Sequence, residues 1–254
     1  MFDTIFRKAV VLIGAHDEVI SLRETVEGIA STCRPEDVAR ILVFLAPHAT
    51  EACLSEANRL AAAGFPIPVA PVREEQADWA NELQHVLGQQ VDASHAVFWT
   101  ADLDAPPSLV AFMVEQARQN PAAVIKPSRF IPGGRLPVGK GAYVNLRDAL
   151  FRWIVCMFYQ CRQTDPHLGL ALFPIRDFIR FDFREKFMSF AIEYLLCFER
   201  LRTPFIEIPL QQRKRSEGKS NISARDRLRF LVPVIRLRFL PKRKLLKEGS
   251  DEQA

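Results

Sequence analysis

The chain has 254 residues, a formal net charge of +4 and 48% hydrophobic residues, which suits one large globular domain and excludes a largely disordered protein. No apolar run reaches the roughly 20 residues that a membrane-spanning helix needs. The charge is uneven, because residues 213–247 hold 13 Lys and Arg against two acidic residues, a local charge of +11 that leaves about −7 on the remainder.

The first hundred residues alternate between apolar runs and amphipathic segments. Residues 9–15 are continuously apolar, as in a strand covered on both faces. Residues 21–30 predict a helix with Ser21 and Glu24 as a capping box. Further strands are predicted at 41–45, 67–72 and 96–99, and further helices at 51–63, where Gly64 ends the helix, and at 78–87. This order predicts an α/β fold with a mostly parallel central sheet.

The second half continues with less regular spacing. We predict helices at 108–119, 146–161 and 190–201, strands at 122–126 and 205–210, a glycine-containing loop at 129–141 and a polar turn at 164–169. The helix at 146–161 is too short and too charged to cross a membrane, so it is either buried or interfacial, and we favour burial. Glu193 lies among apolar residues, which favours a structural pairing with an Arg.

The predicted strand at 96–99 ends in the acidic sequence T-A-D-L-D-A-P-P, in which Pro106 and Pro107 prevent the strand from continuing. On a regular strand Asp102 and Asp104 would point the same way. Carboxylates at the carboxyl end of a parallel strand suit Mg²⁺ or Mn²⁺, which would in turn hold phosphate oxygens. The alternative is an ordinary acidic turn.

Five short motifs, in order along the chain, carry a family resemblance. They are V-V-L-I-G-A-H-D-E, T-A-D-L-D-A-P-P, K-P-S-R-F, T-D-P-H-L-G-L-A-L-F and E-I-P-L-Q-Q-R-K-R-S-E-G-K-S. Together they resemble the inverting family 2 glycosyltransferases with the GT-A fold, most closely the dolichyl-phosphate mannose synthase and polyprenyl-phosphate sugar transferase branch. The resemblance runs from about residue 10 to about residue 223. It implies sugar transfer, with inversion and with help from Mg²⁺ or Mn²⁺, from a UDP- or GDP-linked sugar to a lipid phosphate.

The resemblance also implies roles for particular residues. Two departures from the family pattern matter most, since Thr100 replaces the first Asp of the D-x-D motif and Asn221 replaces a Lys. Asp104 replaces a Gln and could supply the charge that Thr100 lacks. The implied roles are the base and ribose end of the nucleotide for Ala15, Asp17 and Glu18, nucleotide binding for Thr100 and Asp102, the metal for Asp102 and Asp104, phosphates for Arg129, Arg215 and Ser220, and the acceptor for Asp165. Asp102, Asp104, Arg129 and Arg215 are the predicted catalytic residues, and Asp165 remains open between the acceptor and a turn.

The chemistry of the acceptor follows from what the sequence lacks. Transfer to a sugar hydroxyl needs a positioned general base, and no base motif follows Gly169. A lipid phosphate is already anionic and needs no strong base. A lipid-phosphate acceptor is therefore favoured. The alternatives are a glycolipid or other hydroxyl acceptor, and a non-catalytic relative that binds a nucleotide, which Thr100 motivates.

The C-terminal part combines Lys and Arg with apolar residues and predicts an amphipathic extension. We predict a glycosyltransferase domain over 1–223 and a basic tail over 224–254 that binds anionic membrane and that Pro233 and Pro241 divide into short pieces. Nucleic-acid binding is not expected, because aromatic RNA-binding motifs are missing. Five scattered cysteines and a start that builds no signal peptide predict a cytoplasmic protein on the inner face of a membrane.

Overall fold

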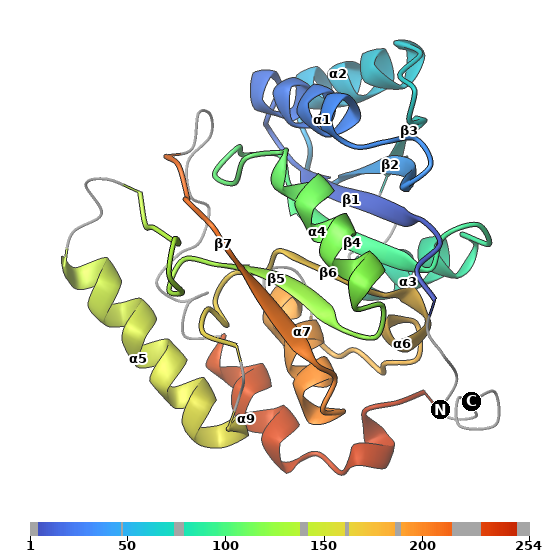
Figure 1. Ribbon diagram of the computed structural model, residues 1–254. Coiled ribbons are helices and arrows are strands. Elements are labelled where there is room, and N and C mark those ends of the chain that lie inside the picture. Colours follow the sequence, from blue (N-terminus) through green and yellow to red (C-terminus); the bar gives the residue numbers. More distant parts are fainter. Residues whose placement is uncertain are drawn as a thin grey trace.

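The computed structural model describes residues 5–46, 48–73, 79–137, 142–160, 163–185, 189–214 and 230–247, within which strands and helices alternate (Figure 1). The strands are β1 (Ala9–Ala15), β2 (Val38–Leu45), β3 (Val69–Arg73), β4 (His95–Thr100), β5 (Val124–Ser128), β6 (Ala171–Pro174) and β7 (Phe205–Pro209). The helices are α1 (Ile20–Thr32), α2 (Glu51–Ala62), α3 (Trp79–Gly88), α4 (Leu109–Gln119), α5 (Ala142–Tyr159), α6 (Ile175–Phe178), α7 (Phe190–Arg200), α9 (Leu231–Phe239) and the 3-10 turn η2 (Lys242–Lys244).

The strands form one seven-stranded sheet in the order β3-β2-β1-β4-β6-β5-β7. All neighbouring pairs are parallel except those of β6, which runs antiparallel to both β4 and β5. The prediction of a mostly parallel central sheet flanked by helices is therefore confirmed. The strand that carries the acidic motif, β4, lies in the middle of the sheet.

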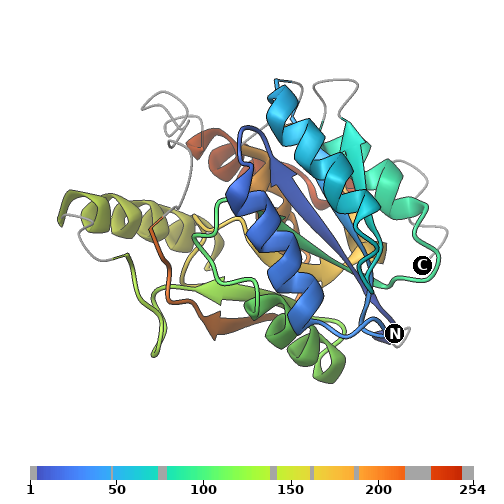
Figure 2. The same cartoon turned by 90° about the horizontal axis from the view of Figure 1, so that it is seen from above.

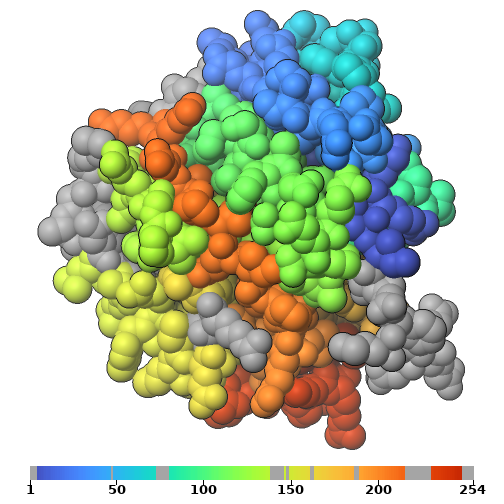
Figure 3. Space-filling view, in the orientation of Figure 1, coloured from blue at the N-terminus to red at the C-terminus, as the bar shows by residue number. Residues whose placement is uncertain are grey.

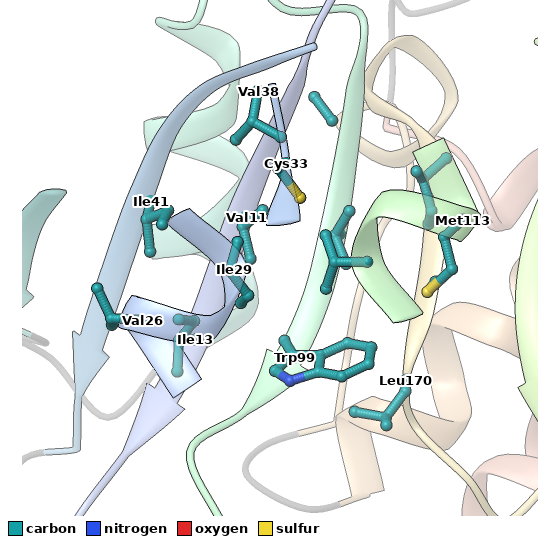
Figure 4. Packing of buried hydrophobic residues seen from close by; sticks show 14 of the residues in the cluster. Val11, Ile13, Val26, Ile29, Cys33, Val38, Ile41, Trp99, Met113 and Leu170 are labelled. Carbon is teal, nitrogen blue, oxygen red and sulfur yellow. The ribbon is translucent and has the colours of Figure 1, made fainter. Parts of the chain in front are cut away.

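Helices cover both faces of the sheet (Figures 1 and 2). Because successive side chains of a strand point to opposite faces, Val11 and Ile13 of β1 pack with α1, α2 and α4, whereas Val10 and Leu12 pack with α3, α5, α6, α7 and α9. Figure 4 shows part of the first layer, in which Trp99 of β4 belongs to the same cluster as side chains of β1 and α1. Strands buried on both faces explain the continuous apolar runs in the sequence.

Most predicted elements are present with shifted ends. The helix predicted at 146–161 begins earlier, at Ala142. The helix predicted at 51–63 ends at Ala62, close to Gly64, whose φ is +68°. The capping box is wrong, because α1 begins at Ile20 and no side chain caps it. Ser21 is instead fully buried within the first turn.

Residues 230–247 pack onto the domain. Phe230, Val234 and Leu237 are buried in the same layer as α7, and Arg200 at the end of α7 donates to the carbonyl oxygens of residues 238 and 240 at 2.6 and 2.7 Å. Pro233, which we predicted would break the tail, lies in the first turn of α9, where its missing N–H removes no helical hydrogen bond. One side of the described part of the tail thus contributes to the hydrophobic core. No helix among the described residues is long and apolar enough to cross a bilayer.

Candidate active site

The ends of β1 and β4 meet at the carboxyl edge of the sheet. Gly14 pairs with Thr100 in the parallel register, and the Ala101 N–H donates to the Gly14 carbonyl oxygen at 3.2 Å. Ala15, at the end of β1, therefore lies beside the start of the acidic motif. This edge is where open α/β sheets bind their ligands.

The acidic motif is a tight turn rather than a continued strand. β4 ends at Thr100, and Leu103 adopts a left-handed backbone conformation with φ of +54°. The Thr100 hydroxyl donates to Asp102 Oδ1 at 2.9 Å, and the Asp104 N–H approaches the same oxygen at 3.5 Å. Because β4 ends before both carboxylates, the same-face arrangement of a regular strand does not apply to Asp102 and Asp104.

The residues that follow β1 form a second turn at the same edge. The Glu18 carboxylate accepts from the N–H groups of His16 and Asp17, at 2.8 and 3.2 Å. Asp17 is exposed, and its carboxylate lies 3.7 Å from His16 Nδ1. In this arrangement Glu18 shapes the turn, while Asp17 presents its carboxylate to solvent.

Arg129, at the end of β5, forms a buried ion pair with Asp165. Its Nε and Nη2 donate to the two carboxylate oxygens at 2.6 and 2.7 Å, and its backbone N–H donates at 3.2 Å. Asp165 is fully buried and the Arg129 side chain is 7% exposed. Of the two roles left open for Asp165, its described contacts correspond to a structural one. Arg129 was predicted to face phosphates, but two of its side-chain nitrogens donate to this carboxylate.

Gln212 connects this ion pair to the acidic turn. Its side-chain oxygen accepts from Arg129 Nη1 at 3.2 Å, and its side-chain nitrogen donates to Asp104 Oδ2 at 2.6 Å. The Arg213 N–H also donates to the Asp104 carbonyl oxygen at 2.8 Å. Gln212 was not among the residues predicted from the sequence. It lies just beyond a strand end and immediately before a basic run, but a neutral amide at such a position has no distinctive spacing.

A buried polar cluster lies behind the ion pair. Lys126 is fully buried and donates to the Leu168 carbonyl oxygen. Its pKa is lowered to about 8, because burial disfavours the charged amine more than Asp165 and Glu207 favour it. Glu207 of β7 accepts from the Thr164 N–H at 2.6 Å. These contacts fix the 164–168 turn, which carries Asp165, against β5 and β7.

A cleft of about 580 Å³ opens beside Gln212. Among the described residues, its wall includes three cationic side chains, Arg135, Arg213 and Lys214, and no acidic one. Gly134, which follows the lining residue Gly133, must be a glycine, because a Cβ would lie 2.6 Å from the Ser128 carbonyl oxygen. The remaining lining residues are Pro106, Gly133, Leu136, Pro137, Pro209, Gln211 and Gln212. The cleft thus has the charge and size to receive an anionic group.

Two predicted phosphate-binding residues, Arg215 and Ser220, lie outside the described residues. Within the described part of the chain, no three His, Cys, Asp or Glu side chains are close enough to form a metal site by themselves. Asp102 and Asp104 therefore remain the predicted protein ligands. Since Mg²⁺ at substrate phosphates uses only one or two carboxylates, two carboxylates fit such an ion.

Comparisons with known proteins show the fold. No protein-family model matches the chain, and no curated protein sequence matches it. Crystal structures of glucosyl-3-phosphoglycerate synthase from Mycobacterium tuberculosis do match it. The complex with Mn²⁺, UDP and phosphoglyceric acid has a TM-score of 0.69 and 16% identity over 92% of this chain and 80% of that one. The complex with Mn²⁺, UDP-glucose and phosphoglyceric acid has a TM-score of 0.70 and 15% identity over 92% and 81%. The chain has the fold of these enzymes, which is the predicted GT-A fold.

Proposed function

We propose that this chain is a glycosyltransferase that moves a sugar, with inversion, from a UDP- or GDP-linked donor to a phosphate-bearing acceptor. The observation that carries the proposal is the basic cleft at the carboxyl edge of the sheet, joined through Gln212 to the acidic turn. A donor diphosphate and an anionic acceptor are the two substrates that this pairing of carboxylates and cations suits. One matching M. tuberculosis structure is a complex with Mn²⁺, UDP and phosphoglyceric acid.

Asp102 and Asp104 would hold Mg²⁺ or Mn²⁺ in this proposal. When bound, the ion would neutralise charge on the departing nucleoside diphosphate. Asp102 is only 4% exposed and its Oδ1 is oriented by Thr100, so its carboxylate is held in place before any ligand arrives. Ala15, Asp17 and Glu18 would contact the base and ribose, because their turn adjoins the acidic motif. Arg215 and Ser220 are proposed to contact phosphates.

The acceptor phosphate would enter the cleft beside Arg135, Arg213 and Lys214. Its oxygen attacks the anomeric carbon of the donor sugar while the bond from that carbon to the diphosphate oxygen breaks. A phosphate monoester is largely ionised near neutral pH, so no proton has to be removed by the protein. The narrower proposal, which rests on the motif resemblance, is that this phosphate belongs to a polyprenyl or dolichyl lipid.

One observation favours a second candidate. Thr100 supplies a hydroxyl where the resembling family has a carboxylate, which removes one negative charge from the acidic turn. A nucleotide-binding protein without transferase activity would tolerate this change. Such a protein would bind UDP or GDP yet release no nucleoside diphosphate from any donor.

The experiment is a panel of UDP- and GDP-sugars tested for binding by calorimetry and for donor hydrolysis, with and without Mn²⁺. Asp102→Asn should remove the Mn²⁺-dependent part of nucleotide binding. Arg135→Gln should leave nucleotide binding unchanged and weaken a phosphorylated acceptor about tenfold, because one charge-assisted contact is lost. Arg7→Gln, at an exposed position far along the sequence from the cleft, is the matched control. If Asp102→Asn keeps the Mn²⁺-dependent increase in nucleotide affinity, the metal assignment is contradicted, and donor binding without turnover would favour the second candidate.

A further inference from the structure

Exposed apolar side chains are concentrated on two neighbouring helices. On α5 they follow one face at intervals of three and four residues. They are Leu146, Leu150, Trp153 and Met157, which are 70%, 55%, 60% and 55% exposed. The prediction that this helix is mainly buried is therefore half right, since Phe151 and Val155 are buried on its other side. Exposed large apolar residues elsewhere in the described chain occur singly, which is ordinary for a protein surface.

The second helix, α9, repeats this division. Val234 and Leu237 are buried, whereas Val232, Ile235 and Phe239 are 49%, 49% and 73% exposed. α9 packs beside α5, because the Tyr159 hydroxyl donates to the Val234 carbonyl oxygen at 2.8 Å. The two helices lie together at one end of the molecule (Figures 1 and 3). Their apolar residues are thus held in place by packed elements.

The same end of the molecule carries exposed positive charge. Residues 230–247 contain no Asp or Glu. Five basic side chains of this segment are exposed, namely Arg238, Lys242, Arg243, Lys244 and Lys247. Arg236, by contrast, is held by Glu185 and Glu193 at 2.8 and 2.6 Å. Exposed apolar residues beside a segment whose charged residues are all basic match the interfacial layer of an anionic bilayer.

We propose that the exposed residues of α5, α9 and η2 form a docking face that seats on anionic lipid. A second copy of the chain is a poorer occupant, because two such faces would bring like charges together. Trp153 suits the proposed depth, since Trp is enriched where acyl chains meet head groups. The Arg152 guanidinium lies 5.4 Å from the centre of the Phe130 ring, so α5 borders the loop that lines the basic cleft. Given the proposed function, docking would bring that cleft to the membrane surface.

The structure dictates how the docking face must be tested. Truncating the tail would remove Phe230, Val234 and Leu237 from the core and uncover the residues they pack against, which would destabilise the fold, so surface substitutions are needed. The apolar variant combines Leu150→Gln, Trp153→Gln and Met157→Gln, and its control combines Ile20→Gln, Val91→Gln and Phe112→Gln at exposed apolar positions elsewhere. The charge variant combines Lys242→Gln, Arg243→Gln and Lys244→Gln. Its control removes the same charge through Arg7→Gln, Arg176→Gln and Arg202→Gln.

The measurement is cosedimentation of the full chain with phosphatidylglycerol vesicles and with phosphatidylcholine vesicles, at low and at high salt. We expect the charge variant to bind phosphatidylglycerol about a hundredfold more weakly at low salt, since each basic residue near an anionic surface contributes about fivefold. The affinity of the apolar variant for phosphatidylglycerol vesicles should fall about tenfold or more. The binding that survives high salt should also weaken in this variant. Both controls should bind as the parent does. If the parent binds both lipids equally weakly, or if variants and controls bind alike, the proposal fails.

Brominated lipids give a second readout. Bromine near the head groups should quench a fluorescence component of the parent that Trp153→Phe lacks, because only an inserted Trp153 comes close enough. Sedimentation velocity without lipid tests whether a second copy of the chain covers the docking face instead. If the parent dimerises while the apolar variant stays monomeric, the membrane assignment is overturned. Donor binding measured on the same variants separates the two proposals. Unchanged nucleotide affinity with lost vesicle binding supports docking whatever the transferase assays show.

Discussion

Arg129 and Asp165 form a two-point ion pair in which the carboxylate is fully buried and the guanidinium nearly so. The pair joins the end of β5 to the turn before β6. Asp165→Asn would remove the buried carboxylate charge that offsets the Arg129 guanidinium, so we expect a loss of about 3 to 5 kcal/mol of unfolding free energy. Denaturant unfolding measures it, with the exposed Asp92→Asn as a control that should change stability by less than about 0.5 kcal/mol. If Asp165 acts on the acceptor alone, the variant will lose activity and keep its stability.

Gln212 lies far from the acidic turn along the sequence, yet its hydrogen bond to Asp104 should stabilise that turn. Gln212→Leu removes the partner of Asp104 Oδ2 and of Arg129 Nη1, which should cost about 1 to 3 kcal/mol and weaken Mn²⁺-dependent nucleotide binding. Gln211→Leu, one residue earlier in the same cleft, is the control. Calorimetric titration of UDP or GDP with and without Mn²⁺ makes the comparison, and equal affinities for the two variants would show that Gln212 does not support the turn.

Thr100 offers a test of metal binding that does not depend on turnover. Its hydroxyl donates to Asp102, so Thr100→Asp would place a second carboxylate against the first and lower the melting temperature in a chelator. Mn²⁺ should restore the loss, because a divalent ion offsets the added charge. Thr100→Val, which removes the hydrogen bond without adding charge, should show no such rescue. Equal effects of Mn²⁺ on both variants would count against a metal at this turn.

Lys126 should make stability depend on alkaline pH. Its pKa in the folded protein is about 8, below the value of about 10.4 of an unfolded lysine. Between these values the unfolded chain holds the proton and the folded chain does not, so stability rises with pH, by at most about 1.4 kcal/mol per unit. This contribution is lost as the pH falls through about 8. Urea unfolding between neutral pH and about pH 10 should show the slope in the parent and not in Lys126→Met. The exposed Lys242→Met should keep it, and a slope shared by all three proteins would reject the assignment.

Arg236 joins α9 to the body of the domain. It donates to Glu193, which also accepts from the backbone N–H groups of Arg184 and Glu185. Burial raises the pKa of Glu193, and Arg236→Met would remove its only described ion-pair partner. We expect a loss of about 3 kcal/mol and faster hydrogen exchange in α9. Arg238→Met, exposed on the same helix, is the matched control, and the prediction fails if both variants exchange alike.

The sequence indicated the elements of the sheet but not their full arrangement. β1 and β4 were predictable because strands buried on both faces must be continuously apolar. The reversal of β6 was not predictable, because a four-residue apolar run carries no information about its direction. The capping box failed because Ser21 is buried by packing that a local motif does not include.

The candidate site was partly predictable for similar reasons. The turn at Asp102 and Asp104 follows a strand and lies within motifs, so sequence reasoning could find it. Gln212 could not be found in this way, because a neutral amide before a basic run has no distinctive spacing. The pairing of Glu193 with an Arg was predicted and is confirmed, since a buried carboxylate needs such a partner.

The packing of residues 230–245 has a consequence for the order in which the protein can complete its structure. The apolar layer under α1, α2 and α4 draws on residues only as far as Leu210, whereas the opposite layer includes Phe230, Leu237 and Leu245. During synthesis from the N-terminus, the first layer can close before residues 230–245 have been made. Until those residues emerge, the part of the second layer that they cover would stay exposed.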